Sequence, residues 1–239
     1  MIRPWYRLRP LYFEAERESV RELQPLMALD VCSKSFPVGL RWQLPMECAV
    51  CSGMFQLRVP GMPRSLDYSI AIVLQPDHPQ TRPLMFSNDP RMPAGRLDRH
   101  IVDTGQACLG VSAELRRKWT AQDGVGGFFR KFVEPFIYWQ AFYDAHGVPP
   151  PEGERSHGAR GILEFYSEEL GVSNQEEIPG LMTLLGQRKP PKGHIPCPCG
   201  SGLKLRNCHG DLIWKAHGKL NPDDVLADLR VVNGGRGSK

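Results

Sequence analysis

Three cysteines and one histidine lie within thirteen residues near the C-terminus, and they limit how this part of the chain can fold. The residues are Cys197, Cys199, Cys208 and His209. Three thiolates and one imidazole form a closed tetrahedral ligand set for zinc. A segment this short cannot bury a core of its own, so we expect metal binding to supply its folding free energy.

The run Cys-Pro-Cys-Gly-Ser-Gly, followed by a basic spacer and Cys-His-Gly, covers residues 197–210. It resembles the SEC-C motif, a zinc-binding family of bacterial proteins. The resemblance implies a structural zinc site, a bacterial origin and a role in protein interaction. Because the ion would use all four ligands, no open position would remain for metal chemistry.

The composition indicates a folded protein of a reducing compartment. The 239 residues are 41% hydrophobic and 23% charged, which is typical of one globular core plus an appendage. Seven cysteines, an odd number, argue against a disulfide framework. The net charge of +4, without a dense Lys/Arg run, does not indicate a nucleic-acid partner. Since no apolar leader or membrane-spanning run occurs, we expect a cytoplasmic protein without membrane contact.

The first part of the chain, 1–147, predicts an α+β domain. Helical spacing of apolar residues predicts a helix over 12–29, bent near Pro25. Short apolar or alternating runs, separated by Pro and Gly, predict strands of an antiparallel meander. These strands are expected at 38–44, 48–60 and 67–76.

The stretch 77–105 is rich in Pro, Arg, Asp and Gly, and it predicts a structured excursion that is neither helix nor strand. A short helical turn is expected over 113–120. An aromatic helix is expected over 126–147, interrupted at Pro135 and ended by Gly147. This helix should cover the sheet.

Two further regions follow the first domain. Residues 148–190 are expected to hold a Pro/Gly-rich linker, 148–158, and accessory helices. Residues 191–239 hold the zinc motif and a last helix. The helices of both regions are expected at 159–170, 175–187 and 223–231.

Four cysteines lie outside the zinc motif, and their contexts differ. Cys48 and Cys51 form a CxxC inside a predicted strand, so we interpret them as half-buried strand residues, with a redox role as the alternative. Cys32 falls in a loop before the strands. Cys108 follows a turn-like Asp-Thr-Gly, and its immediate neighbours fit a core residue, a metal ligand or a nucleophile equally.

The order of helix, antiparallel meander, Pro-rich excursion, cysteine, tryptophan and helix resembles the ubiquitin-conjugating enzyme fold. The resemblance spans about residues 10–147. His-Pro-Gln-Thr-Arg-Pro (78–83) is similar to that family's Tyr-Pro-x-x-Pro-Pro turn, and Trp119 lies near its tryptophan. The segment 100–111 is similar to the one that ends in the active cysteine. The positions that hold its register are Ile101, Gly105, Cys108 and Leu109.

This resemblance implies a four-stranded domain in which Cys108 carries a thioester. The thiolate would accept an activated C-terminal glycine and pass it to a target amine. His100 stands where the family has the asparagine of His-Pro-Asn, whose amide stabilises the oxyanion. An imidazole N–H would donate a similar bond, or the ring would deprotonate the amine; the alternative is a surface histidine bonded to backbone. Asp103 or Asp123 would orient the amine.

Such departures from the family pattern are similar to those of relatives in bacterial antiphage operons, notably CBASS. There, conjugation joins the C-terminus of a cGAS-like nucleotidyltransferase to a target. Because the chain shows no Gly-rich nucleotide loop, this function requires a separate activating enzyme. The modifier would be a ubiquitin-like protein or such a nucleotidyltransferase, joined to a target protein. The alternatives are a catalytically silent scaffold with a SEC-C interaction tail and a cysteine hydrolase with a Cys108–His100 dyad.

Overall fold

The computed structural model describes residues 3–39, 41–59, 65–151, 155–156 and 158–234, so parts of the expected strand 38–44 and linker 148–158 lie outside the described residues. The chain forms two compact units. The first comprises 1–109 and 119–153, and the second comprises 110–118 and 154–239. Residues 110–118 therefore belong with the C-terminal part of the chain rather than with the domain expected over 1–147. The accessory helices and the metal motif, expected as separate regions, share one unit.

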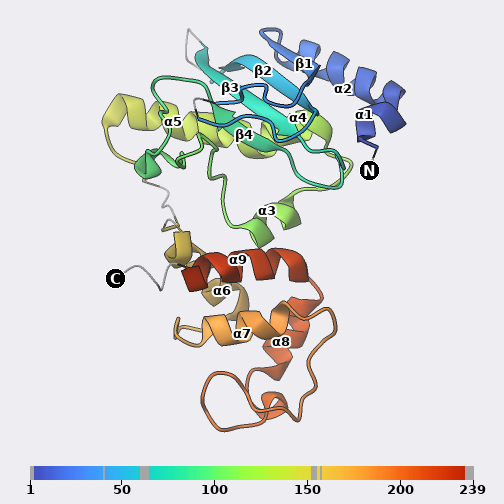
Figure 1. The fold of residues 1–239 in the computed structure, drawn as a ribbon. Helices are drawn as coiled ribbons and strands as arrows, with labels where there is room; N and C mark the ends of the chain where they lie inside the picture. Colours follow the sequence, from blue (N-terminus) through green and yellow to red (C-terminus); the bar gives the residue numbers. More distant parts are fainter. Residues whose placement is uncertain (1–2, 40, 60–64, 152–154, 157, 235–239) are drawn as a thin grey trace. The chain divides into compact units, whose positions relative to one another are not determined.

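The first unit is built on a four-stranded antiparallel sheet whose strands follow chain order (Figure 1). The strands are β1 (Met27–Cys32), β2 (Cys48–Leu57), β3 (Leu66–Leu74) and β4 (Leu84–Ser87). The α+β class and the antiparallel sheet expected from the sequence are confirmed, as are the strands expected at 48–60 and 67–76.

The helix expected over 12–29 ends earlier than its apolar spacing predicts. Helix α2 spans Pro10–Leu23, and β1 begins four residues after its end. Pro25 ends the helix because proline lacks a backbone N–H and clashes with the preceding turn. The buried Gln24 then braces the neighbouring strand, since its amide accepts the Gln56 N–H at 2.8 Å and donates to the Gln56 carbonyl at 3.1 Å.

Two other predictions for this region were wrong. The described residues of 38–44, which are 38–39 and 41–44, form no strand, and the pairing in this loop is an isolated bridge between Pro37 and Gln43. The excursion 77–105 does contain a strand, because the apolar run of β4 pairs with β3 from Ile70 to Val73. A run of four residues is too short to show a period against its Pro-rich surroundings.

A helical segment runs from Gly124 to His146, as the sequence predicts over 126–147. It consists of α4 (Gly124–Phe128), a π-helical turn η2 (Phe129–Val133) and α5 (Glu134–His146). The turn ends where Pro135 starts the next helix, since proline cannot donate to the helical ladder. Helix α5 ends at Gly147 in the left-handed conformation, φ +70°. The Phe129 ring meets Phe55 of β2 at 5.4 Å, so this segment covers the sheet (Figure 1).

A buried carboxylate joins α2 to the start of α4. Glu16 accepts the Val125 N–H at 2.9 Å, and its other oxygen lies 3.8 Å from Nε2 of the buried His78. Burial acts to raise the pKa of Glu16, but interactions with His78, Tyr12 and the Val125 N–H outweigh burial, so its pKa lies below the ordinary value.

This lowered pKa predicts a pH dependence of stability. The Glu16 carboxylate stabilises the first unit fully above its ordinary pKa of 4.5, and that stability is lost as pH falls through the lower, folded pKa. We expect Glu16→Gln to cost about 1–3 kcal/mol at neutral pH and to flatten the acid loss. Urea unfolding at several pH values measures both effects. The exposed Glu18 on the same helix supplies a control, Glu18→Gln; equal acid losses in all three proteins would contradict the prediction.

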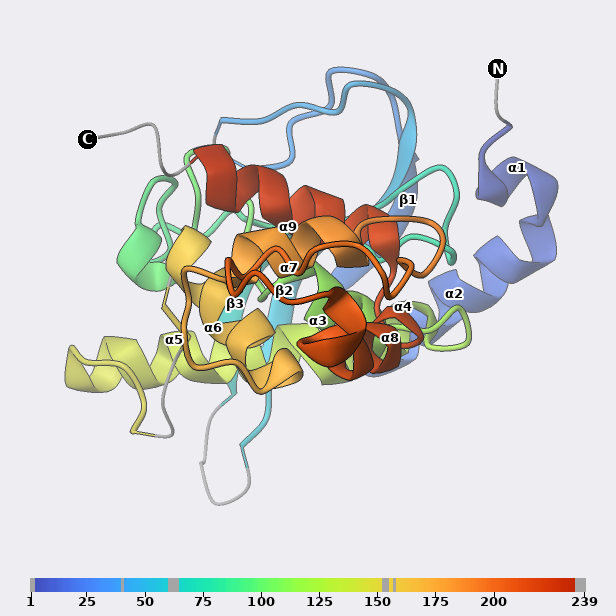
Figure 2. The same ribbon diagram turned by 90° about the horizontal axis from the view of Figure 1, so that it is seen from below.

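The second unit is helical (Figure 2). Its helices are α3 (Ser112–Lys118), α6 (Gly158–Leu170), α7 (Ile178–Leu185), α8 (Gly210–His217) and α9 (Pro222–Gly234). The helices expected at 113–120, 159–170, 175–187 and 223–231 are confirmed with shifted ends, whereas α8 was not predicted. Figure 2 shows α7 and α9 side by side, and they pack against each other. No helix in the described part of the chain has the length and apolar character needed to cross a membrane.

The core of the second unit includes the short helix α3. Val111 and Ala113 are buried in the same cluster as Phe165 and the ligand Cys197. Asp228 of α9 accepts the backbone N–H groups of Ser112 and Ala113, both at 3.2 Å, and the Tyr166 hydroxyl at 3.0 Å. A carboxylate distant in sequence thus caps the N-terminus of α3.

Candidate metal centre

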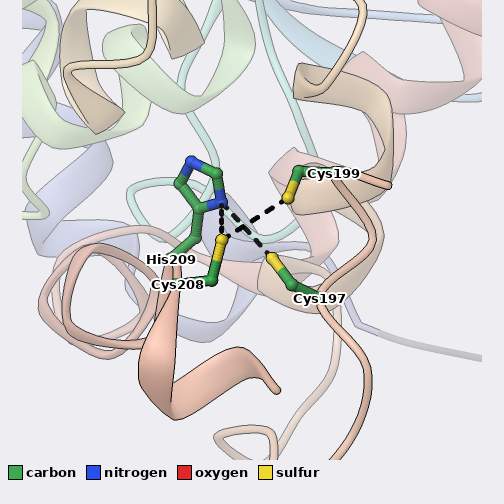
Figure 3. Close-up of side chains that lie close together, drawn as sticks. All are labelled: Cys197, Cys199, Cys208 and His209. Atoms are coloured by element: carbon green, nitrogen blue, oxygen red, sulfur yellow. Dashed lines mark hydrogen bonds between the residues drawn. The ribbon is translucent and has the colours of Figure 1, made fainter. Parts of the chain in front are cut away.

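The four ligand side chains expected from the sequence converge in the second unit (Figure 3). His209 Nδ1 lies 3.3 Å from Sγ of Cys197 and 3.3 Å from Sγ of Cys208, and Cys199 Sγ lies 3.5 Å from Cys208 Sγ. All four ligand atoms lie within 4.8 Å of one another. Tetrahedral zinc, with bonds of about 2.0 Å to nitrogen and 2.3 Å to sulfur, separates its ligands by roughly 3.5–3.8 Å. The set therefore fits a metal ion such as zinc after small movements.

Two turns bring the ligands together. Gly200 and Gly202 adopt left-handed conformations, φ +81° and +74°, that other residues rarely take. The chain then doubles back, and the Cys197 N–H bonds to the Leu203 carbonyl at 2.8 Å. A 3₁₀ turn, η3 (Leu205–Asn207), follows and places the last two ligands directly before α8. The local spacing predicted the ligands because the turns lie within the same short run.

Glu177 is a member of the site that sequence reasoning missed. It directly precedes α7, and its Oε2 lies 3.5 Å from His209 Nε2. A carboxylate on one ring nitrogen orients a histidine so that the other nitrogen faces the metal. Here that other nitrogen, Nδ1, faces the thiols (Figure 3). No local spacing could reveal Glu177, because it lies just before α7, outside the run that holds the four ligands.

The thiols differ in acidity. The hydrogen bond from Ser201 lowers the pKa of Cys199 to about 6, and Cys197 and Cys208 add to that effect. Burial raises the pKa of Cys197 to about 11. Cys199 is therefore the more readily ionised of these two ligands at neutral pH. This matters for the site because a metal binds the thiolate form of cysteine.

Cys108 lies in the first unit and differs from the cysteines of the sheet. Cys108 is exposed, whereas Cys32 is half-buried and ends strand β1, rather than lying in a loop as the sequence predicted. Cys48 and Cys51 are 3% and 0% exposed, which is more buried than predicted, because β2 is a central strand. Burial raises the pKa of both thiols. Residues three apart on a strand face opposite sides of the sheet, so these two cannot form a CxxC redox pair without rearrangement.

His100 lies beside Cys108. It follows a 3₁₀ turn, η1 (Leu97–Arg99), and adopts φ +55°. An isolated bridge joins Ile101 to Ala107, and the Cys108 N–H donates to the His100 carbonyl at 2.7 Å. The His100 ring meets the Trp139 ring edge-on, with centroids 4.9 Å apart. His100 and Cys108, which the sequence analysis proposed for one catalytic site, are therefore joined by a backbone hydrogen bond.

The two aspartates considered for amine binding have different surroundings. Asp103 is exposed in the turn between Ile101 and Ala107. Asp123 accepts the Thr120 N–H at 2.6 Å and pairs with Lys131 at 2.7 Å. These contacts give Asp123 a structural task at the start of the helical segment.

Comparison with known proteins agrees with the geometry of the metal centre. Residues 195–211 match the SEC-C motif, so the site is of the SEC-C class. The chain is also similar to the protein translocase subunit SecA of Chlorobium limicola, with 39% identity over 56 residues. That match covers 23% of this chain and 5% of the SecA chain, so the chain spans a small fraction of this relative.

Proposed function

We propose that the protein is a thioester transferase of the ubiquitin-conjugating type, with a structural zinc ion in its second unit. The observation that carries the proposal is the exposure of Cys108, because the described cysteines outside the metal cluster are otherwise buried or half-buried. The thiol lies on the loop that follows a four-stranded antiparallel sheet, in the order that the resemblance implies. His100, the second proposed catalytic residue, lies next to it.

In the proposed first step, the Cys108 thiolate attacks the carbonyl carbon of a C-terminal glycine that a separate enzyme has activated. The C–S bond forms and the activating group leaves with its electron pair. In the second step, a target amine attacks the thioester, loses a proton and releases the thiolate. The His100 imidazole would donate an N–H to the oxyanion or accept the amine proton. Zinc stabilises the second unit and takes no part in this reaction.

The proposed partners follow from this chemistry. The modifier is a ubiquitin-like protein or the C-terminus of a cGAS-like nucleotidyltransferase, and the acceptor is a target protein, in a bacterial antiphage system. The second candidate function is a binding scaffold, because the resemblance to the SEC-C motif, which residues 195–211 match, implies a role in protein interaction.

Substitution of Cys108 tests the transferase. After co-expression with its neighbouring genes, we expect the wild type to carry a heavier, reductant-sensitive adduct in intact-mass and non-reducing gel analysis. Cys108→Ala should abolish it, and Cys108→Lys should make it reductant-resistant, because an amide replaces the thioester. Cys32→Ala, a half-buried cysteine of the same unit, should behave as wild type.

The opposite result would favour the scaffold. If no adduct forms although the activating enzyme is present and active, Cys108 is not an acyl carrier. An acyl group that appears on Cys108 only transiently and is released to water would support the hydrolase.

A further inference from the structure

Gln140 is a fully buried polar residue on α5, and both ends of its amide bind Arg99. Its Nε2 donates to the Arg99 carbonyl at 2.7 Å, and its Oε1 accepts from the Arg99 guanidinium at 3.3 Å. The same guanidinium pairs with Asp144 at 2.6 Å and lies over the Tyr143 ring at 4.6 Å. Helix α5 therefore binds both the backbone carbonyl and the side chain of Arg99.

The bond to the Arg99 carbonyl fixes the peptide that leads into His100. His100 is one of the few residues other than glycine with positive φ, at +55°. This left-handed conformation persists in an L-residue only where its surroundings hold it. The next carbonyl along the chain, that of His100, accepts the Cys108 N–H at 2.7 Å. A side-chain-to-backbone hydrogen bond at the Arg99 carbonyl and a backbone hydrogen bond at the His100 carbonyl thus connect the Gln140 amide to the proposed nucleophile.

The neighbouring residue on α5 contacts the side chain of the same histidine. Trp139 meets the His100 ring edge-on at 4.9 Å. Consecutive residues of one helix therefore hold the His100 ring and the peptide that precedes it. A buried amide of α5 thus contacts the short loop that holds both the left-handed His100 and the exposed residue Cys108.

We propose that Gln140 is a positioning residue for Cys108. It holds the left-handed turn at His100, and that turn sets the position of the Cys108 backbone and thiol. The relevance to acyl transfer rests on the proposed function, whereas the effect on thiol reactivity does not.

Alkylation of Cys108 by iodoacetamide tests this inference in the full-length protein. The rate is followed by mass spectrometry of the Cys108 peptide over a range of pH. Gln140→Leu removes both amide bonds at similar volume, and Gln140→Glu keeps an acceptor for Arg99 but loses the donor to its carbonyl. We expect both variants to change the rate of Cys108 alkylation by roughly two- to tenfold at one or more of the pH values measured, so that the pH profile of the rate differs from that of wild type.

Gln24→Leu is the matched control. Gln24 is also buried in the first unit, and its amide also binds backbone groups, those of Gln56. Its loss should lower the melting temperature without changing the alkylation of Cys108. Wild-type alkylation in folded Gln140→Leu and Gln140→Glu would overturn the inference. Altered alkylation without any acyl adduct in wild type would instead refute the transferase and leave the positioning role intact.

Discussion

Cys208→Ser, like removal of the metal by a chelator, is expected to destabilise the second unit severely and to leave the first unit folded. The Cys208 sulfur contacts two of the other ligands, Cys199 and His209. Structural zinc supplies about 10–16 kcal/mol to small zinc peptides, more than the whole stability of many domains. Because Cys197 also belongs to the helical core, loosening of the metal loop should spread to that core.

Hydrogen exchange by mass spectrometry, with metal content measured in parallel, resolves the two units. We expect one zinc per wild-type chain, and loss of protection over 195–217 and in α7 when the metal is absent. Peptides of β2 and β3 should remain protected. Cys32→Ser controls for the loss of any cysteine and should retain its zinc. Full zinc occupancy and unchanged protection in Cys208→Ser would refute the assigned ligand set.

Asp228→Ala has the second largest expected effect. It removes the acceptor of two backbone N–H groups, those of Ser112 and Ala113, and of the Tyr166 hydroxyl. Each buried group left unpaired costs about 1–3 kcal/mol, so we expect a loss of about 3–5 kcal/mol after partial relaxation. Urea unfolding, followed through hydrogen exchange of α6 and α9 peptides, measures it.

Asp223→Ala provides the control, because Asp223 is exposed in the first turn of the same helix. Its effect should stay within about 0.5 kcal/mol. Equal losses in the two variants would mean that Asp228 does not stabilise α3.

Burial raises the pKa of Asp228 despite opposing hydrogen bonds, so its contribution to stability is full below the ordinary pKa of 3.8 and falls as pH rises through the folded value. This sign is opposite to that of Glu16.

The sequence predicts features that depend on short stretches of chain. The metal ligands could be assigned because Cys197 to His209 form one local run with the chemistry of a zinc site. Strands β2 and β3 were recognisable from their apolar runs. The start of β1 was not, because Met27 to Leu29 continue the helical spacing of α2 and only Pro25 marks the boundary.

Features that depend on distant contacts could not be predicted. The Asp228 carboxylate reaches α3 from more than a hundred positions away, and no period in the sequence encodes that meeting. Glu177 and Gln140 likewise act on residues of other elements. For Cys108, the sequence left burial and exposure open, and the structure shows exposure; its role as acyl carrier stays a prediction.

Helix α3 belongs to the second unit but lies, in the sequence, between the two segments of the first unit. A single cut in the chain therefore cannot separate the two units. A protein truncated after residue 153 would keep Val111 and Ala113 but lose the apolar side chains and the Asp228 cap that surround them. The exposed residue Cys108 would then be followed in the sequence by a segment whose apolar side chains have lost their partners. Fusing the metal-binding unit to another protein would require two connections, because the unit consists of two separate segments. The recipient would have to accept 110–118 as an insertion as well as 154–239 as an extension.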